Sequence, residues 1–228
     1  MRWPTMAVME PRVATAPPLA EQVYELIIDD ICSGVIKGGE QLRQEAIAAR
    51  FGVSRQPVQQ AMVLLKRHGL VRESGRRGLE VVPMDPAFVN HLYDMRELLD
   101  VHAVKLSAGS FDQDTDLSAL NEIVNRGVEA VEARAFSEMV TADADFHMFF
   151  YRLTGNPFLL DTAVLLSQSI RRVMTEVLAR GGVPDWVWEE HQAIAEAVIR
   201  GDIDEAGHCA HHHIEHGRSM MLEAMSCT

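Results

Sequence analysis

The fold is decided by residues 51–62, FGVSRQPVQQAM. Gly52 ends a short amphipathic segment, and Ser54 is a residue type that is favoured at helix N-termini. Pro57 then falls within the first turn of the next segment, where its missing amide proton costs no hydrogen bond. The pattern predicts two helices joined by a tight turn, over about 44–51 and 54–68. Residues predicted to face the core on the second helix are Val58, Met62, Val63 and Leu65.

Further elements surround this pair of helices. Apolar residues at helical spacing over 19–31 predict a helix before it. The inward residues predicted there are Val23, Leu26, Ile27 and Ile31. After the pair, Leu70-Val71 and residues 79–82 flank a glycine-rich turn, which predicts two short strands. Helix, helix, tight turn, helix and hairpin together predict a winged helix-turn-helix domain over 18–83.

The rest of the chain is predicted to be helical. Breaks at glycine, asparagine and proline residues divide it into segments with helical periodicity and no strand pattern. The predicted helices cover 86–108, 116–133, 136–153, 157–180, 185–200 and 202–224. The predicted fold class is therefore mainly α, with the winged helix-turn-helix followed by an all-α six-helix bundle over 84–228. Residues 1–17 contain prolines and lack apolar periodicity, and they are predicted to be a disordered tail.

Charge is divided unevenly along the chain, whose formal net charge is -12. Residues 41–79 hold eight lysine or arginine residues against two acidic ones, whereas the chain from residue 84 onward holds ten against 24. A basic segment ahead of an acidic domain is expected where only the first part faces phosphate groups. Apolar runs are shorter than a membrane span and the three cysteines are scattered. We therefore expect a cytoplasmic protein without a disulfide framework or a thiolate zinc site.

The second helix of the predicted pair is suited to reading double-stranded DNA. In a helix-turn-helix, the first residues of this helix reach base edges in the major groove, and the wing lies along the backbone. Arginine side chains match guanine, and glutamine side chains match adenine or phosphate oxygens. The candidate DNA-binding residues are Ser54, Arg55, Gln56, Gln59, Gln60, Arg76, Arg77 and Gly78. The alternative is a solvated basic helix that packs on a partner protein.

Four inward-facing residues of the predicted bundle form a candidate metal site. Asp143 and His147 are four residues apart, so both lie within the apolar stripe of one helix. His191 and His213 fall within the apolar stripes of two other helices. One carboxylate and three imidazoles suit zinc, nickel, iron or manganese. The alternative is that each histidine is a hydrogen-bonded core residue and that Asp143 is a buried partner of one of them.

Three further histidines follow one another at four-residue steps on the last predicted helix. His208 and His212 point away from the apolar stripe, and His216 lies at its margin. This spacing permits adventitious metal binding. The interpretation preferred on sequence grounds is a solvated face.

The first 80 residues or so resemble the DNA-binding domain of the GntR regulators. The resemblance rests on residues 41–62, QLRQEAIAARFGVSRQPVQQAM, and on the later segments HGLV at 68–71 and RRG at 76–78. The chain departs from the family pattern at Gln59-Gln60, where the family usually has Arg-Glu. Because that arginine commonly contacts DNA, the resemblance implies an operator sequence or affinity that differs from the usual one.

The helical part resembles the FCD domain of the FadR subfamily, in the six-helix form of its VanR-like branch. The motifs that carry the resemblance are Asp94-x-Arg96-x-x-Leu99-Asp100, Asp143-x-x-Phe146-His147, Gly155-Asn156-Pro157 and Glu190-His191-x-x-Ile194. The resemblance implies a homodimer in which the aspartate and three histidines hold a divalent metal ion at the floor of a pocket for small carboxylates. A departure is Asp100, where the family usually has glutamate.

Arg96 is the candidate effector-binding residue. It lies at the edge of the apolar arc of the helix over 86–108, close enough to the interior to present its guanidinium to a bound carboxylate. An ordinary ion pair is the alternative. His102 shares the arc and is interpreted as a core histidine. The residues assigned to the arc are Phe88, Leu92, Met95, Leu99 and Leu106.

The predicted function is that of a ligand-responsive DNA-binding transcriptional regulator, with repression as the expected direction. Its expected partners are operator DNA, a small carboxylate and a second copy of the chain, with no membrane. Effector binding would favour one relative arrangement of the two DNA-binding domains. One alternative is a direct metal-sensing regulator. Another is a metal-dependent hydrolase fused to a DNA-binding module, which is disfavoured because no carboxylate beside the four ligands stands out as a general base.

Overall fold

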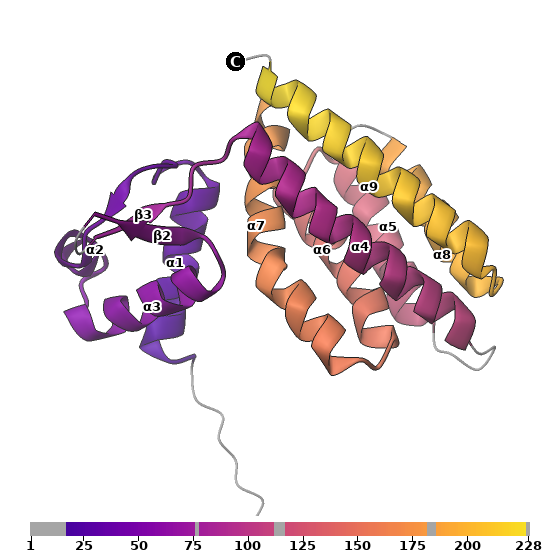
Figure 1. The fold of residues 1–228 in the computed structure, drawn as a ribbon, viewed down its shortest axis with the longest axis horizontal. Coiled ribbons are helices and arrows are strands. Elements are labelled where there is room, and N and C mark those ends of the chain that lie inside the picture. Colours follow the sequence, from indigo (N-terminus) through magenta and orange to yellow (C-terminus); the bar gives the residue numbers. More distant parts are fainter. Residues whose placement is uncertain (1–16, 76–77, 112–116, 182–185, 227–228) are drawn as a thin grey trace, which may run out of the picture.

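The structure, a computed structural model, describes residues 17–75, 78–111, 117–181 and 186–226. Figure 1 shows two bodies joined by one segment: a small N-terminal body in indigo and purple, and a larger helical bundle coloured from magenta to yellow. The predicted fold class, a winged helix-turn-helix followed by an all-α bundle, is confirmed. The predicted tail lies outside the described residues except for its last position.

Within residues 17–83, the structure describes three helices and a three-stranded antiparallel sheet. The elements are α1 (Leu19–Cys32), β1 (Gln41–Leu42), α2 (Gln44–Phe51), α3 (Arg55–Arg67), β2 (Val71–Ser74) and β3 (Gly78–Val81). β3 lies in the middle of the sheet, with Val81 opposite Val71 of β2 and Glu80 opposite Gln41 of β1. The sequence does not predict β1, because two residues are too few to show strand alternation.

Local sequence explains where several elements begin and end. Gly52 has φ 65° and ψ 31° at the end of α2, a left-handed conformation that glycine adopts without strain. A Cβ atom on Gly78 would lie 2.9 Å from the backbone oxygen of Ser74, so the turn of the wing leaves room only for glycine. Before the first helix of the bundle, the Asp85 carboxylate accepts a hydrogen bond from the Phe88 amide at 2.7 Å.

Two predictions of core residues in the N-terminal body are wrong. Leu26 on α1 and Val63 on α3 are 46% and 64% exposed. The residues that are buried on these helices, and that the sequence does not predict, include Tyr24 and Ile28 on α1 and Ala61 on α3. Alanine carries little weight in a helical wheel, yet its small size lets a neighbouring helix approach closely. On α3, a wheel centred on the large side chains is therefore displaced from the face that packs.

Among the described residues from 84 onward, six helices form the bundle. They are α4 (Pro86–Ser110), α5 (Ser118–Glu132), α6 (Phe136–Leu153), α7 (Pro157–Gly181), α8 (Trp186–Ile199) and α9 (Ile203–Ser226). Their bounds agree with the predicted helices to within two residues at each end. α4 and α9 lie side by side (Figure 1), α8 packs on α9, and α6 packs on both α5 and α7. No helix in the described part of the chain is long and apolar enough to cross a membrane.

The inward face of α4 is polar in its middle. Arg96 and Asp100 are buried there, so Arg96 lies at the centre of the buried face and not at its edge. Met95 and Leu106 are 41% and 39% exposed, and His102 is exposed. The predicted arc is therefore wrong at Met95 and Leu106, and so is the interpretation of His102 as a core histidine. Its other members hold, since Leu92 is buried and Phe88 and Leu99 pack against the core. Hydrophobicity does not mark this face, because its buried polar side chains compensate one another.

α7 packs on α1 and is the bundle helix nearest to the N-terminal body (Figure 1). An Arg171 Nη2 atom lies 3.0 Å from Asp29 Oδ1 on α1. The next residue, Arg172, donates a hydrogen bond from Nη1 to the Val82 carbonyl oxygen at 2.6 Å. Val82 lies directly after β3, so two adjacent arginines hold both α1 and the segment that leads into the bundle.

Candidate functional site

Three helices bring the four candidate metal ligands together inside the bundle. α6 supplies Asp143 and His147, while α8 and α9 supply His191 and His213. All four side chains are buried. Asp143 and His147 share a face because a step of four residues is close to one helical turn. The structure therefore places in one cluster the four residues that helical periodicity singles out.

One atom of each ligand faces a common point. His191 Nε2 lies 3.1 Å from His213 Nε2 and 3.5 Å from Asp143 Oδ1, and His147 Nε2 lies 3.8 Å from the same oxygen. All four ligand atoms lie within 4.8 Å of one another. Around a tetrahedral ion with bonds of about 2.1 Å, neighbouring ligand atoms are about 3.4 Å apart. The spacing therefore fits one ion without a large movement of the helices.

Two carboxylates hold histidine rings of this cluster from outside. Asp100 Oδ1 lies 3.4 Å from His147 Nδ1, and Glu190 Oε2 lies 2.9 Å from His213 Nδ1. Each carboxylate favours a proton on Nδ1, which leaves the Nε2 lone pair directed into the cluster, as is usual for metal-ligating histidines. The sequence does not predict these roles, because each carboxylate lies on a different helix from its histidine. The one sequence signal is that Glu190 directly precedes His191.

Two buried polar atoms of the cluster make no hydrogen bond within the described residues. They are Asp143 Oδ2 and His191 Nδ1. Asp143 Oδ2 lies 3.5 Å from Arg96 Nη2, so it has an ion-pair partner although it accepts no hydrogen bond. An unsatisfied buried polar atom such as His191 Nδ1 costs about 1–3 kcal/mol. A cation at the cluster would compensate the carboxylate of Asp143. Nothing in the described residues accounts for His191 Nδ1.

Burial and charge give three of the four ligands, Asp143, His191 and His213, protonation states that suit metal binding. Burial alone raises the pKa of Asp143, but His147 and Arg96 beside it hold that pKa well below its usual range. Burial lowers the pKa of both His191 and His213. Near neutral pH the carboxylate is therefore ionised and these two imidazoles are neutral, which is the state in which such groups bind a cation.

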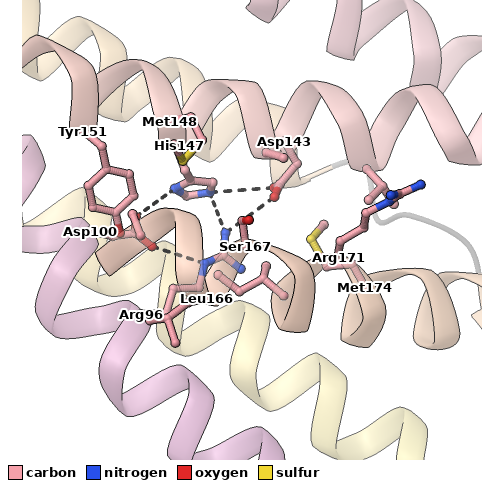
Figure 2. A pocket seen from close by; sticks show the side chains of 14 residues that line it. Arg96, Asp100, Asp143, His147, Met148, Tyr151, Leu166, Ser167, Arg171 and Met174 are labelled. Carbon is pink, nitrogen blue, oxygen red and sulfur yellow. Dashed lines mark hydrogen bonds and ion pairs between the residues drawn. The ribbon is translucent and has the colours of Figure 1, made fainter. Parts of the chain in front are cut away.

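Arg96 lies against the cluster with its guanidinium between two carboxylates (Figure 2). Its Nε atom is 3.2 Å from Asp100 Oδ2, and its Nη2 atom is 3.5 Å from Asp143 Oδ2. The same Nη2 atom donates to His147 Nε2 at 2.6 Å. Burial lowers the pKa of His147, yet Asp100 and Asp143 raise it overall. The hydrogen bond from Arg96 occupies the Nε2 lone pair that His147 would offer to a metal ion.

A pocket opens beside Arg96, between α4, α6 and α7 (Figure 2). It has a volume of about 480 Å³ when its open mouth is included. The cluster side of the pocket is charged, through Arg96, Asp100 and Asp143. The apolar lining consists of Val140, Ala144, Met148, Ala163, Leu166, Ile170 and Met174. Arg171 also lines the pocket, and its charged end is directed away from Arg96 in Figure 2. This combination suits a small molecule with one polar end and an apolar body.

The candidate DNA-binding residues at the start of α3 all lie on the surface. The exposed residues are Ser54, Arg55, Gln56, Gln59 and Gln60. Ser54 stands at the N-cap of α3 without a side-chain capping hydrogen bond, and Arg55 forms an exposed ion pair with Glu45 of α2 at 3.1 Å. Gly78 begins β3 at the base of the wing. Arg76 and Arg77 lie outside the described residues.

Two family models match separate parts of the chain. Residues 19–81 match the model described as "Bacterial regulatory proteins, gntR family", and residues 91–216 match the model of the "FCD domain". The first match contains the exposed residues at the start of α3. The second contains Arg96 and the four candidate metal ligands.

Similar proteins and solved structures cover most of the chain. The HTH-type transcriptional repressor RspR of Escherichia coli strain K12 is 24% identical over 207 residues, which cover 91% of this chain and 90% of that protein. The probable D-xylose utilization operon transcriptional repressor of Paenarthrobacter nicotinovorans is 26% identical over 206 residues, or 88% and 87% of the two chains. Among solved structures, E. coli McbR/YncC aligns with a TM-score of 0.77 at 17% identity, over 92% of this chain and 100% of that one. A putative GntR transcriptional regulator from Rhodococcus sp. RHA1 aligns with a TM-score of 0.74 at 23% identity, over 90% and 98%.

Proposed function

This chain belongs to the gntR family of bacterial regulatory proteins and carries an FCD domain, and from that premise we propose that it is a repressor controlled by a small carboxylate bound beside a metal ion. The chain is a DNA-binding transcriptional regulator, as its family and relatives are, which sets the hydrolase alternative aside. The observation that carries the finer proposal is a cluster of four convergent ligands, two of which, Asp143 and His147, line a pocket together with Arg96. Such a regulator would work in the cytoplasm, where operator DNA is found.

The residues that would hold the ion are Asp143, His147, His191 and His213. The spacing of their ligand atoms, the carboxylates behind two of the rings and the neutral imidazoles all support this assignment. One carboxylate and three imidazoles suit zinc, nickel, iron or manganese. When bound, the ion would supply a fixed positive charge at the wall of the pocket, which attracts a carboxylate.

Arg96 would bind the effector carboxylate. The Nε2 lone pair of His147 serves one partner at a time, so Arg96 gives up its hydrogen bond when His147 ligates an ion. Its Nη2 atom is then available to a ligand in the pocket. A guanidinium can bind a carboxylate through two parallel hydrogen bonds. Because the remaining lining is largely apolar, the effector class is a small carboxylate with an apolar portion.

Arg171 would connect the pocket to the DNA-binding domain. It lines the pocket from α7 and pairs with Asp29 on α1 at 3.0 Å. A carboxylate that draws Arg171 inward weakens this pair, so effector binding would change how α1 rests on the bundle. The change would reach the recognition helix α3 because α1 packs on α3.

The exposed face of α4 supports a homodimer. Met95, Leu98 and Leu106 are 41%, 65% and 39% exposed and lie along one side of the helix. An exposed apolar row of this kind is typical of a protein–protein contact. A second copy of the chain, with its own α4 on this row, would place two recognition helices on one operator with two half-sites.

Replacement of Arg55 by alanine is expected to weaken operator binding by about 1–3 kcal/mol, because a base-edge contact at the start of α3 is lost. Affinity is measured by fluorescence anisotropy with an operator selected from a random DNA pool. Arg200→Ala is the matched control, since Arg200 is also an exposed arginine paired with a glutamate but lies on the bundle. Parental affinity of Arg55→Ala at every salt concentration would contradict the assignment of α3 as the reading helix.

The regulatory part of the proposal is tested by adding a panel of small carboxylates to metal-loaded protein bound to operator DNA. One chemical class is expected to change operator affinity by about fivefold or more, and only when metal is present. If metal alone changes the affinity and no carboxylate has an effect, the protein is a direct metal sensor instead.

Asp29→Asn tests whether the coupling passes through Arg171, because it removes the partner of Arg171 and leaves every pocket residue in place. The carboxylate should still raise the melting temperature of this variant, but its effect on operator affinity should be lost. Asp161→Asn, which changes an exposed carboxylate of α7, should keep the parental response. A parental response in Asp29→Asn would show that the coupling does not pass through Arg171.

A further inference from the structure

A second group of metal-ligating side chains lies on the solvent side of α8 and α9. Oε1 of Glu190, from α8, is 2.8 Å from His216 Nδ1 and 3.2 Å from His212 Nδ1. The side chains of His212 and His216 are four residues apart on α9 and are 62% and 41% exposed. On sequence grounds, the row of histidines on α9 is interpreted as a solvated face. In the structure, two of them lie beside a carboxylate from a second helix.

We propose that Glu190, His212 and His216 form a second, solvent-accessible site for a divalent metal ion. Two imidazole nitrogens and one carboxylate oxygen are a common ligand set for zinc and nickel. The three ligand atoms lie within 4.8 Å of one another. Neighbouring ligand atoms around a four-coordinate ion lie about 3.4 Å apart, so the exposed side chains need to move only slightly. Each ring would carry its proton on Nε2, a divalent cation would bind the freed Nδ1 lone pairs and the Glu190 carboxylate, and water would complete the coordination.

The surrounding residues hold two of the three ligands in place before a metal ion binds. The ring of His216 stacks on Trp186, with the ring centroids 3.6 Å apart and the planes inclined by 13°. The other oxygen of Glu190 accepts a hydrogen bond from His213 Nδ1 at 2.9 Å. Little side-chain entropy therefore remains to be lost on metal binding. This restraint distinguishes the group from a freely rotating pair of histidines on an exposed helix.

Equilibrium dialysis of untagged protein against free zinc, with the bound zinc counted by elemental analysis, tests the proposal. The parent is expected to bind about one more zinc ion per chain than either His212→Ala or His216→Ala, because each variant loses one of three ligands. His212 is exposed, so His212→Ala should keep the parental melting temperature in chelator, whereas His216→Ala also loses the stacking contact with Trp186. Glu190→Gln is a less direct test, because Glu190 also holds His213 of the buried cluster.

His208→Ala and His211→Ala are the matched controls. His208 is exposed one turn before His212, and His211 is exposed and pairs with Glu97. Both variants should bind as much zinc as the parent. Equal zinc counts in the parent, His212→Ala and His216→Ala would overturn the proposal, and so would the same loss in His208→Ala, which would indicate diffuse binding along the helix. The difference in bound zinc between variant and parent does not depend on metal in the buried cluster. The experiment therefore tests the second site independently of the first.

Discussion

Alanine in place of Asp143 is expected to empty the buried cluster of metal. Parent protein purified without a histidine tag should carry about one more equivalent of divalent metal after dialysis than the variant. Asp143 supplies the negative charge among the four ligands, and His147 and Arg96 already keep its pKa well below the usual range despite its burial. His191→Ala should have the same effect, because His191 Nε2 lies within 3.5 Å of ligand atoms from two other helices.

Asp145→Ala is the matched control, because Asp145 lies two residues further along α6 but is exposed and pairs with Arg126 at the surface. This variant should retain its metal. Chelation provides an independent measurement, since an ion at 1,000 times its Kd stabilises the folded state by about 4 kcal/mol. A chelator should therefore lower the melting temperature of the parent and of Asp145→Ala but not that of Asp143→Ala. Suppose that the untagged parent contains no metal and that neither chelator nor added zinc, nickel or manganese changes its melting temperature. The four residues then belong to an ordinary core.

The burial of the candidate metal ligands could be predicted from the sequence because their helices have clear apolar stripes. Large buried side chains such as Met139 and Phe150 on α6 or Ile194 on α8 define the inward direction. Asp143 and His191 interrupt those stripes, so their positions alone show that they face the interior. The exposed start of α3 is predictable for the same reason, since Val58 and Met62 define the opposite, buried side of that helix.

The inward face of α4 could not be predicted in this way. Arg96 and Asp100 are buried at its centre, whereas Leu98 on another side is 65% exposed. A helical wheel treats the burial of each residue as independent of its neighbours in space. These side chains, however, are stabilised by partners on α6 that are distant in the sequence. The role of Glu190 behind His213 is hidden for the same reason. Such pairings depend on how helices pack, and the periodicity of a single helix does not contain that information.

Methionine in place of Arg96 is expected to destabilise the metal-free protein by about 3–5 kcal/mol. The guanidinium lies 3.2 Å from the Asp100 carboxylate and 3.5 Å from the Asp143 carboxylate, and all three side chains are buried. Methionine occupies a similar space but leaves both carboxylates without this cation in an interior that solvates charge poorly. The free energy of unfolding is measured by urea titration in the presence of a chelator.

The matched control is Arg126→Met, which removes an exposed arginine paired with Asp145 and should cost less than about 1 kcal/mol. Comparing the stability loss with metal and with chelator distinguishes a loss of charge compensation from a packing defect. A bound ion would compensate Asp143, so Arg96→Met should lose less stability with metal than with chelator, whereas a packing defect costs the same in both. The variant should also lose the carboxylate-induced rise in melting temperature, because its pocket no longer presents the guanidinium. If Arg96→Met is no less stable than Arg126→Met in chelator, Arg96 does not compensate buried carboxylates, and the reason for placing an anionic effector beside it is removed.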